Sequence, residues 1–542
     1  MTSTRTRVAV VVAAVTALAM SAAPAAFAGG YPLPENPGKI SKPTKHVKKL
    51  VASKTCTSSA LRAHTCFATI AAAVAAAKQT GTHRYEYTIT ITKGTWREPV
   101  IAEGHQWDGL TITGSTSNAK DTIIDLSTLS APDNQDAILI NGVAGVTVKN
   151  LTVTHYKGNG VWIVNVQNMF GTKTYLVDNV IASFGGVYGI FARNSFGGTM
   201  SHSEAYYNND SGFYVGETPT QTKPLRTTLT GLKAWGNELG FSGTNSRYVT
   251  ITKSKWFNNG IGIVPNLLFS EDFPPPAFNT IIDNDVYGNN LNYFVGTNAD
   301  NTSTAVATRE NRIQVTPFTV NYGALGGGDY PPGMGILLFG SQDTVIQNNR
   351  IWDNHLIGVA MYNPGVLLKD TSGYRAVCGT PSVPIVSTDC TMLKEKLKLK
   401  RNKVIGNVFG RGGANLNGRD LFYANDDIGN CVGGTGANAN VAMNVVLGNE
   451  NQAFQSCDAS GYNKLATQRM GFEAYLYGLS FTDTTSNAGT TAFGHVNNLS
   501  HDGFWLRTTG QAAWPTGFGT PIERCKFKVA ATPLSGCVGD GK

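Results

Sequence analysis

The clearest pattern along the chain is a six-residue unit of alternating polar and apolar positions that closes on asparagine. The unit reads Ser, Asn or Leu, then any residue, an apolar residue, an apolar or aromatic residue, any residue and Asn. Its copies are SEAYYN from Ser203, LKAWGN from Leu232, SKWFNN from Ser254, NDVYGN from Asn284, NRIWDN from Asn349 and NKVIGN from Asn402. The tightest spacing, between Asn237 and Asn259, suits three short strands with their turns, so the pattern predicts a solenoid.

A glycine that opens a short apolar strand is a second landmark of the repeat. It begins the segments GFYVGE at Gly212, GFSGTN at Gly240, GIGIVP at Gly260 and GVAMYN at Gly358. One coil can be followed from strand AILI at 137 through VTV at 146 and LTV at 151 to VWIV at 161. Three strands per coil predict an all-β parallel β-helix. The closing asparagines are expected to stack at equivalent turns, as structural residues; they are Asn208, Asn237, Asn259, Asn289, Asn354 and Asn407.

The segments around the repeat predict the domain organisation. In the segment 69–78, apolar Ile70, Val74 and Ala77 recur at helical spacing, which predicts a short capping helix before strands begin at Tyr87–Thr92. We expect a flexible leader rich in Pro and Lys over 29–54, the β-helix with its cap over 55–463, and C-terminal strands with a disulfide-closed cap over 464–542. The last segment either caps the solenoid or covers one of its faces.

The N-terminus predicts export. Arg5 and Arg7 precede an apolar run that ends in Ala26, Phe27 and Ala28, the pattern of a secretory signal peptide over 1–28. The run is too short to span a bilayer, so a secreted, extracellular protein without a membrane anchor is expected. The eight cysteines fall into four close sequential pairs, which predicts structural disulfides: Cys56 with Cys66, Cys378 with Cys390, Cys431 with Cys457, and Cys525 with Cys537.

Composition narrows the alternatives. The chain has 61 Gly and only 15% charged residues, which disfavours helical bundles and fits strands and turns covered by neutral polar side chains. The 44 Lys and Arg exceed the 36 Asp and Glu, giving a formal net charge of +8. These basic residues do not gather into a phosphate-tracking face, so nucleic acid is not expected as a partner.

The segments TIAAAVAAAK, ITITKGTWRE and the Asn-rich repeats resemble the secreted pectate-lyase-like superfamily of right-handed parallel β-helices. YGIFARN, SGFYVGETP and GMGILLFGSQDTVIQNNRIWDN resemble a bacterial branch of it, related to NosD-type carbohydrate-binding and sugar-hydrolase repeats. The resemblance covers roughly residues 66–460. It implies a right-handed β-helix and a polysaccharide partner, in a superfamily of lyases, hydrolases, epimerases and non-catalytic members. No lyase or polygalacturonase catalytic motif can be matched onto the chain.

Strand alternation predicts an aromatic stripe on one outer face. In the strand after each glycine the first and third residues are apolar and point inward, so the second and fourth point outward. The outward set is Trp162, Phe191 with Arg193, Tyr214, Phe294, Phe339 and Tyr362. Such side chains can stack on sugar rings and bind substrate. The alternative is that loops or the C-terminal segment cover the stripe as a second small core.

Long insertions leave the coils at equivalent positions and should wall a groove beside the stripe. They are 217–226, 266–279, 297–333 and 363–398, with polar residues Glu217, Glu271, Asp272, Asp329, Tyr330 and Arg375. Hydrolysis needs two carboxylates, for which Glu217 with Asp272 or Asp329 is the candidate pair. Eliminative lysis of an acidic glycan needs a base and a cation, for which Arg193, His202, Tyr214 or Tyr362 could serve.

Cofactor and activity stay open at this stage. Calcium would suit an acidic substrate, but no calcium motif is present, and DNDVYGNN at Asp283 resembles a metal loop only in composition. The competing class is a non-catalytic secreted carbohydrate-binding or cell-envelope protein.

Overall fold

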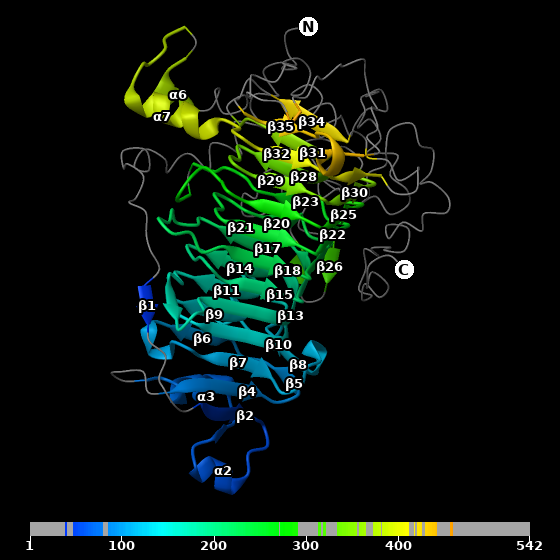
Figure 1. Ribbon diagram of the computed structural model, residues 1–542. Helices are drawn as coiled ribbons and strands as arrows, with labels where there is room; N and C mark the ends of the chain where they lie inside the picture. The colour runs from blue at the N-terminus through cyan, green and yellow to red at the C-terminus, as the bar shows by residue number, and fades with distance from the viewer. Residues whose placement is uncertain are drawn as a thin grey trace.

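The chain winds into stacked coils, each of which adds one strand to each of three parallel sheets (Figure 1). The computed structural model describes residues 38–40, 47–79, 85–269, 271–290, 313–315, 318–320, 333–354, 357–364, 372–380, 382–410, 417, 420–424, 429–441 and 456–458. Across these residues the expected all-β parallel β-helix is confirmed. The signal peptide and the segment 464–542 lie outside the described residues, so their assignments stay predictions.

Two of the sheets meet at bends inside long strands. The first contains β2 (Val47–Ala52), β4 (Glu86–Ile91), β7 (Thr111–Gly114), β15 (Thr199–Ser201), β18 (Thr227–Thr230), β21 (Val249–Thr252), β24 (Thr280–Ile282), β29 (Val345–Gln347), β32 (Lys403–Ile405) and β35 (Cys431–Val432). The second contains β5 (Gly94–Trp96), β8 (Thr122–Asp125), β16 (Glu204–Asn208), β19 (Lys233–Trp235), β22 (Lys255–Phe257), β25 (Asp285–Tyr287), β30 (Arg350–Trp352) and β33 (Val408–Phe409). The long strands β10 (Val146–Thr154) and β13 (Tyr175–Gly185) run through both sheets and bend at Asn150 and Asn179, which have φ of 57° and 52°. Asparagine tolerates this left-handed conformation better than most residues do.

The third sheet carries the strands that follow the glycine landmarks. It has ten strands: β6 (Val100–Glu103), β9 (Ile138–Asn141), β11 (Val161–Val164), β14 (Ile190–Arg193), β17 (Ser211–Gly216), β20 (Leu239–Ser242), β23 (Ile261–Val264), β28 (Met334–Phe339), β31 (Ile357–Tyr362) and β34 (Leu421–Ala424). The sequence-based coil is confirmed, except that VTV at 146 and LTV at 151 form the single strand β10.

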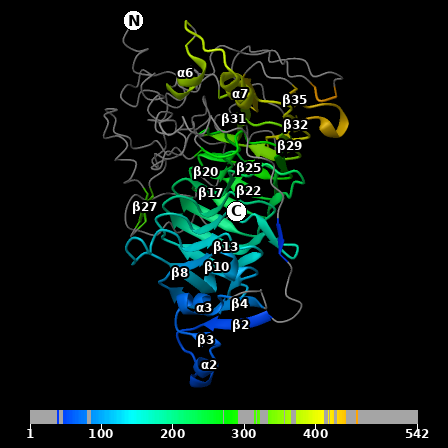
Figure 2. The same ribbon diagram turned by 90° about the vertical axis from the view of Figure 1, so that its left-hand side faces the viewer.

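The remaining elements lie at the ends and sides of the stack. They are β1 (Gly38–Ile40) paired with β12 (Asn168–Phe170), the antiparallel pair β26 (Ile313–Val315) and β27 (Phe318–Val320), β3 (Cys66–Phe67), α2 (Ser58–Arg62), α3 (Ile70–Ala76), α6 (Ser372–Cys378), α7 (Thr388–Leu397), and the 3-10 turns at His105–Trp107, Ala119–Asp121 and Gly436–Asn438. The predicted capping helix is confirmed as α3. Thr69 caps it, Ile70, Val74 and Ala77 are buried, and it lies at the N-terminal end of the stack (Figure 2).

The expectation of a flexible leader over 29–54 is wrong for Val47–Ala52, because these residues form β2, the first strand of the first sheet. All six residues of β2 pair in register with β4, from Val47 opposite Glu86 to Ala52 opposite Ile91. Leu50 and Ala52 are buried against the core, whereas Lys49 is exposed and the Lys48 ammonium lies 3.8 Å from the centroid of the Tyr85 ring. The strand was missed in the sequence because Lys48 and Lys49 interrupt its alternation of apolar and polar residues.

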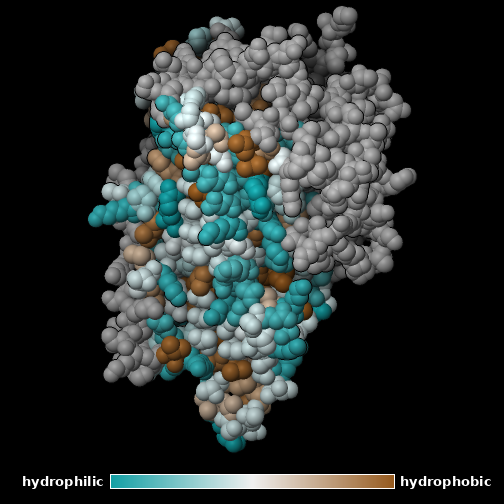
Figure 3. All heavy atoms as spheres, turned by 45° about the vertical axis from the view of Figure 1, so that its right-hand side comes forward, coloured by the Kyte–Doolittle hydropathy of each residue, from teal (hydrophilic) through white to brown (hydrophobic). Residues whose placement is uncertain are grey.

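The core is a set of aliphatic files that run along the solenoid axis. One file aligns a residue from each coil of the first sheet: Leu50, Ile89, Ile112, Val148, Val177, Met200, Leu229, Ile251, Ile281, Ile346, Val404 and Val432. All are buried. On the face shown in Figure 3, the described residues are mostly hydrophilic or neutral, with small separate hydrophobic patches.

The asparagine ladder is confirmed for five of the six predicted members. The Nδ2 groups of Asn208, Asn237, Asn259 and Asn289 each donate to the Oδ1 of the next asparagine along the axis, at 2.9–3.1 Å, up to Asn354. Asn354 then donates to Asn417, so the placement of Asn407 in this ladder is wrong. Asn407 continues a parallel ladder through Asn284 and Asn349, because the copy NKVIGN sits one strand out of phase with the other copies.

The glycine landmark has a steric cause beside this ladder. A Cβ on Gly240 would lie 2.5 Å from the carbonyl oxygen of Gly262 and 2.9 Å from Nδ2 of Asn259. The equivalent residue in the next coil is Gly262, two positions after the predicted Gly260, because Phe241 pairs with Ile263. Only glycine fits where the ladder approaches the next coil so closely.

The fourth position of the repeat builds an outward-facing ring ladder on the second sheet. The rings stack in order at centroid distances of 4.3–5.6 Å: Tyr206, Trp235, Phe257, Tyr287 and Trp352. Their neighbours Ala205, Ala234, Trp256, Val286 and Ile351 point into the core. The last four rings of the ladder are nonetheless buried. The out-of-phase copy has Ile405 at this position, in agreement with its different place in the coil.

Three of the four predicted disulfides are confirmed. Cys56 bonds Cys66 beside α2, Cys378 bonds Cys390 between α6 and α7, and Cys431 bonds Cys457 at the C-terminal end of the described coils. The fourth pair, Cys525 and Cys537, lies outside the described residues. Disulfides fit an oxidising compartment.

Candidate functional site

A cluster of acidic and aromatic side chains lies on the outer face of the third sheet, where β14 and β17 meet the insertion that follows β23. We call the group Tyr188, Arg193, Asp210, Tyr214, Glu217 and Glu271 the acidic site. Arg193 ends β14, Tyr214 points outward from β17, and Glu217 follows β17 directly. The insertion 266–279 brings in Glu271 from two coils further along.

Arg193 and Glu217 form a two-pronged ion pair. The Nε of Arg193 lies 2.5 Å from Oε1 of Glu217, and its Nη2 donates to Oε2 at 2.8 Å. Glu217 is 3% exposed, and its hydrogen bond and charge raise the pKa of Arg193. Glu217 has a φ of 46°, a left-handed turn conformation that recurs at many non-glycine turn residues of this solenoid. The backbone N–H of Asp272 also donates to Oε2 of Glu217, at 3.4 Å.

Glu271 is a largely buried carboxyl group with a raised pKa. Burial, and then the negative charge of Glu217, raise the pKa of Glu271 from 4.5 to about 7. The Tyr214 hydroxyl donates to Oε2 of Glu271 at 3.1 Å and, with Arg193, partly opposes this rise. The site therefore pairs a carboxyl that can donate a proton with a carboxylate held by an arginine. A carboxyl with a raised pKa beside a second carboxyl is an arrangement found at acid and base catalytic sites.

Tyr188 and Asp210 complete the acidic site, beside Phe191 and Tyr214. The Tyr188 ring packs on Phe191 and Tyr214, with centroids 4.7 and 4.8 Å away. Burial raises the pKa of Asp210 to about 6, against hydrogen bonds from Ser211 and Tyr188. Burial and the charges of Asp210, Glu271, Glu238 and Glu217 raise the pKa of Tyr188 well above its usual value.

The predicted aromatic stripe is wrong as one continuous, solvent-exposed row. Trp162, Phe191 and Tyr214 pair in one register, and Trp162 stacks on Phe191 at 5.8 Å. This row of paired residues continues from Tyr214 to Ser242 and Val264, which are not aromatic. Phe339 and Tyr362 belong to a different row, in which Phe339 pairs with Tyr362 and with Asn266. Phe191, Tyr214, Phe339 and Tyr362 are 2–9% exposed, and only Trp162 keeps an accessible part. These four side chains therefore fit the alternative of a small second core.

The structure unites some predicted catalytic residues and separates others. Arg193 and Glu217 are in contact, but Asp272 joins them through its backbone while its side chain is exposed. His202 lies elsewhere, after β15, where its Nδ1 is 2.8 Å from Asp178. Asp329 and Phe294 lie outside the described residues. The insertions at 217, 266 and 363 follow β17, β23 and β31 of the same sheet, as predicted. The groove that they should wall remains a prediction.

Sequence reasoning missed Tyr188 and Asp210 and placed Glu271 only among the polar loop residues. A signal was present, because Asp210 and Glu238 stand two residues before Gly212 and Gly240 in consecutive coils. Their equivalence is confirmed by the pairing of Ser211 with Leu239. Buried carboxyls of like charge, one coil apart, are expensive for stability and so indicate function.

Within the described part of the chain, no three His, Cys, Asp or Glu side chains gather as a metal site would require. The same residues contain no helix that is long and apolar enough to cross a bilayer.

The buried carboxyls predict that stability decreases between about pH 4 and pH 7. The pKa values of Asp210 and Glu271 are raised to about 6 and 7, and that of Asp420 to about 7, chiefly by burial. Between about pH 4 and 7 the folded state thus binds more protons than the unfolded state, and the free energy of unfolding falls as pH rises. Urea unfolding at several pH values measures this slope. Glu271→Gln should flatten it, and an unchanged slope would contradict the assignment.

These features define a parallel β-helix protein with an acidic site on its third sheet. Residues 136–313 match a family model described as "Right handed beta helix region", which agrees with the strand pairing and confirms the expected fold. A search of curated proteins finds no match.

Three solved structures illustrate the likeness. The mannuronan C-5 epimerase AlgE6 A-module of Azotobacter vinelandii is 14% identical, with 70% of this chain and 94% of that chain covered and a TM-score of 0.38. Pectate lyase Pel9A is 14% identical, with 72% and 80% covered and a TM-score of 0.35. The Dettilon tailspike protein is 12% identical, with 72% and 66% covered and a TM-score of 0.37. The architecture stands on the strand pairing rather than on these likenesses.

Proposed function

We propose that this is an exported protein that binds a polysaccharide beside β14, β17 and the insertion 266–279 and hydrolyses a glycosidic bond there. The observation that carries the proposal is the proximity of Glu271, whose pKa is raised to about 7, to Glu217, which is held by Arg193. Export is supported by the N-terminal sequence and the three disulfides.

In this reaction Glu271 acts as the general acid. Its proton passes to the glycosidic oxygen as the bond from that oxygen to the anomeric carbon breaks. Water then adds to the anomeric carbon and gives its proton to Glu217, which yields one new reducing end for each bond cleaved. Arg193 holds Glu217 in position, and Tyr214 orients Glu271 through the 3.1 Å hydrogen bond.

The same geometry argues against eliminative lysis by Arg193. A lyase base must be able to lose its proton, but Glu217 raises the pKa of Arg193 further. Because Glu217 already balances the charge of the single arginine, the residues of the acidic site include no further cation for a substrate carboxylate, and a neutral glycan suits it better than the acidic one expected from the net charge.

The test is to incubate the mature protein with neutral and acidic polysaccharides and to measure reducing ends and unsaturated uronate absorbance. We expect reducing ends from a neutral glycan, no uronate absorbance, and a rate that falls as pH rises through about 7, as Glu271 loses its proton. Uronate absorbance with an acidic glycan would contradict the proposal.

Binding without chemistry is the second candidate, and the burial of the site favours it. Tyr214 is 2% exposed and Glu217 3% exposed, which limits direct access of a sugar to both. Retained glycan binding with neither product detected would establish this function instead.

A further inference from the structure

A helical hairpin near the C-terminal end of the described coils has an apolar tip. The hairpin consists of α6 and α7 and projects from the side of the β-helix (Figures 1 and 2). Three aliphatic residues between the helices are exposed: Val383 by 71%, Ile385 by 44% and Val386 by 94%. Most other exposed large hydrophobic residues of the described chain stand singly, as is normal for a protein surface. Three within four residues form a local apolar surface.

The hairpin is rigid rather than a loose loop. The disulfide between Cys378 and Cys390 joins the two helices, and Leu393 and Leu397 pack with Leu267 and Phe269 in a small core of its own. The tip is closed by backbone hydrogen bonds. The N–H of Ile385 donates to the carbonyl of Cys378 at 3.0 Å. The N–H of Val383 donates to the carbonyl of Thr380 at 3.1 Å.

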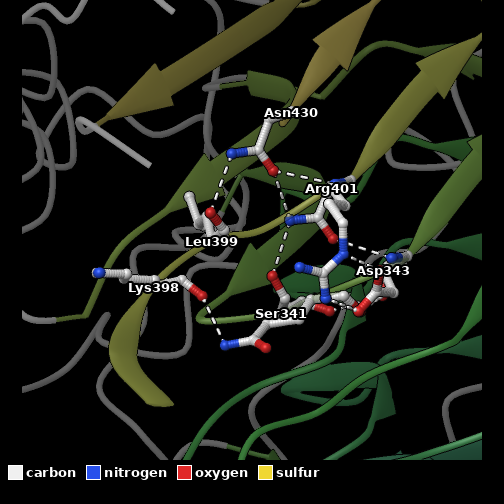
Figure 4. A network of polar contacts seen from close by, with 9 residues as sticks. Ser341, Asp343, Lys398, Leu399, Arg401 and Asn430 are labelled. Atoms are coloured by element: carbon white, nitrogen blue, oxygen red, sulfur yellow. Dashed lines mark hydrogen bonds and ion pairs between the residues drawn. The ribbon is translucent and has the colours of Figure 1, made fainter. Parts of the chain in front are cut away.

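The root of the hairpin is fixed to the β-helix by the network in Figure 4. Arg401 forms a two-pronged ion pair with Asp343, at 2.5 Å for both prongs. Nδ2 of Asn430 donates to the backbone carbonyl of Leu399 at 3.1 Å, and Nε2 of Gln342 donates to the backbone carbonyl of Lys398 at 3.1 Å. The tip is therefore presented at a set position relative to the coils.

Basic residues predominate behind the tip. The segment 372–401 contains six basic residues, Arg375, Lys394, Lys396, Lys398, Lys400 and Arg401, against two acidic residues, Asp389 and Glu395. Lys398 and Lys400 are paired with Glu395, and Arg401 is paired with Asp343, so these three basic residues are engaged at the root of the hairpin. Lys394 is exposed on α7, and Asp389, also exposed, is the one acidic residue close to the tip.

We propose that this hairpin docks the protein on the surface of an anionic lipid bilayer. The tip would enter the interfacial region while Lys394 contacts the lipid headgroups. Internal hydrogen bonds of the tip make entry less costly, because Val383 and Ile385 do not carry unpaired N–H groups into an apolar medium. Docking of this kind needs no spanning segment.

A bilayer suits the tip better than a protein partner does. A stable protein interface buries about 800 Å² on each side and is anchored by Trp, Tyr or Arg. The tip offers only three aliphatic side chains. Insertion into the apolar part of a bilayer can bury them without a partner surface of complementary shape. The inference is independent of the proposed glycan chemistry, because the hairpin tip and the acidic site share no residue.

The test is sedimentation of the mature protein with vesicles of phosphatidylcholine alone or mixed with phosphatidylglycerol. We expect binding to the anionic vesicles that weakens with salt. The combined change Val383→Ser, Ile385→Ser and Val386→Ser should weaken it roughly a hundredfold, and Lys394→Gln about fivefold. Leu61→Ser is the matched control, because Leu61 is 47% exposed on α2, beside the disulfide at the opposite end of the molecule.

Two results would overturn the inference: no binding of the unchanged protein to anionic vesicles, or equal binding by the triple variant. Size-exclusion chromatography tests whether the tip instead contacts a second copy of the chain. If the unchanged protein is a dimer that does not bind vesicles, and the triple variant is a monomer, the tip is a dimer contact. Thermal unfolding of each variant checks that it folds. If the triple variant does not, Val386→Ser alone, at the most exposed position, should still weaken binding about tenfold.

Discussion

Glu271→Gln is expected to abolish glycan hydrolysis while glycan binding persists. The amide has nearly the shape of the acid and can still accept the hydrogen bond from the Tyr214 hydroxyl, but it has no proton to give to the glycosidic oxygen. Loss of a general acid typically lowers the rate about 10²- to 10⁴-fold. The measurement is the release of reducing ends at pH 6, together with the binding constant for the same glycan.

Asp272→Asn is the control for this change, since it removes a neighbouring carboxylate of the same insertion. The Asp272 side chain is exposed, and its contact with Glu217 runs through the backbone N–H, which the substitution keeps. We expect a change of less than about threefold in rate, because an exposed charge is well screened by solvent. If Asp272→Asn lost as much activity as Glu271→Gln, the acid would be misassigned.

The second large effect is expected for Asn259→Ala in the buried ladder. Asn259 is fully buried, accepts from both the N–H and the Nδ2 of Asn237, and donates to Ala234, Phe257 and Asn289. Alanine leaves several of these groups without partners, each costing about 1 to 3 kcal/mol. We expect the free energy of unfolding to fall by roughly 3 to 5 kcal/mol, as measured by urea denaturation.

An exposed ladder in the same solenoid provides the comparison. Asn165 donates to Asn141 at 3.0 Å and accepts from Asn194 at 2.8 Å, but water can replace both bonds. Asn165→Ala should therefore cost less than about 1 kcal/mol. Equal losses for the two variants would show that stacking of asparagines, rather than their burial, carries the stability.

The sequence determined the coils because each coil repeats the same steric problem. The apolar third position of the unit, as in Ala234 and Trp256, must fill the core, and the closing asparagine must satisfy buried backbone groups. Periodicity reports both requirements directly. It was less reliable where charged residues masked a strand, as in β2, and where a copy kept the motif but shifted phase, as at Asn407.

The site could be predicted only in part. Strand alternation correctly pointed Arg193 and Tyr214 outward, and the insertion pattern drew attention to Glu217. Alternation gives direction but says nothing about what covers a face, so the burial of Phe191, Tyr214, Phe339 and Tyr362 was beyond it. Nor could it show that Glu271, rather than Asp272, turns its carboxyl toward Tyr214.

The sequence by itself therefore determined the β-helix, its axial ladders and three confirmed disulfides, since these depend on local spacing repeated along one axis. Only the tertiary structure decided which carboxyls meet. Glu217 and Glu271 come from insertions of different coils, and the pKa of about 7 at Glu271 arises from burial and from the charge of Glu217. Both causes depend on the three-dimensional arrangement, which residue spacing does not encode.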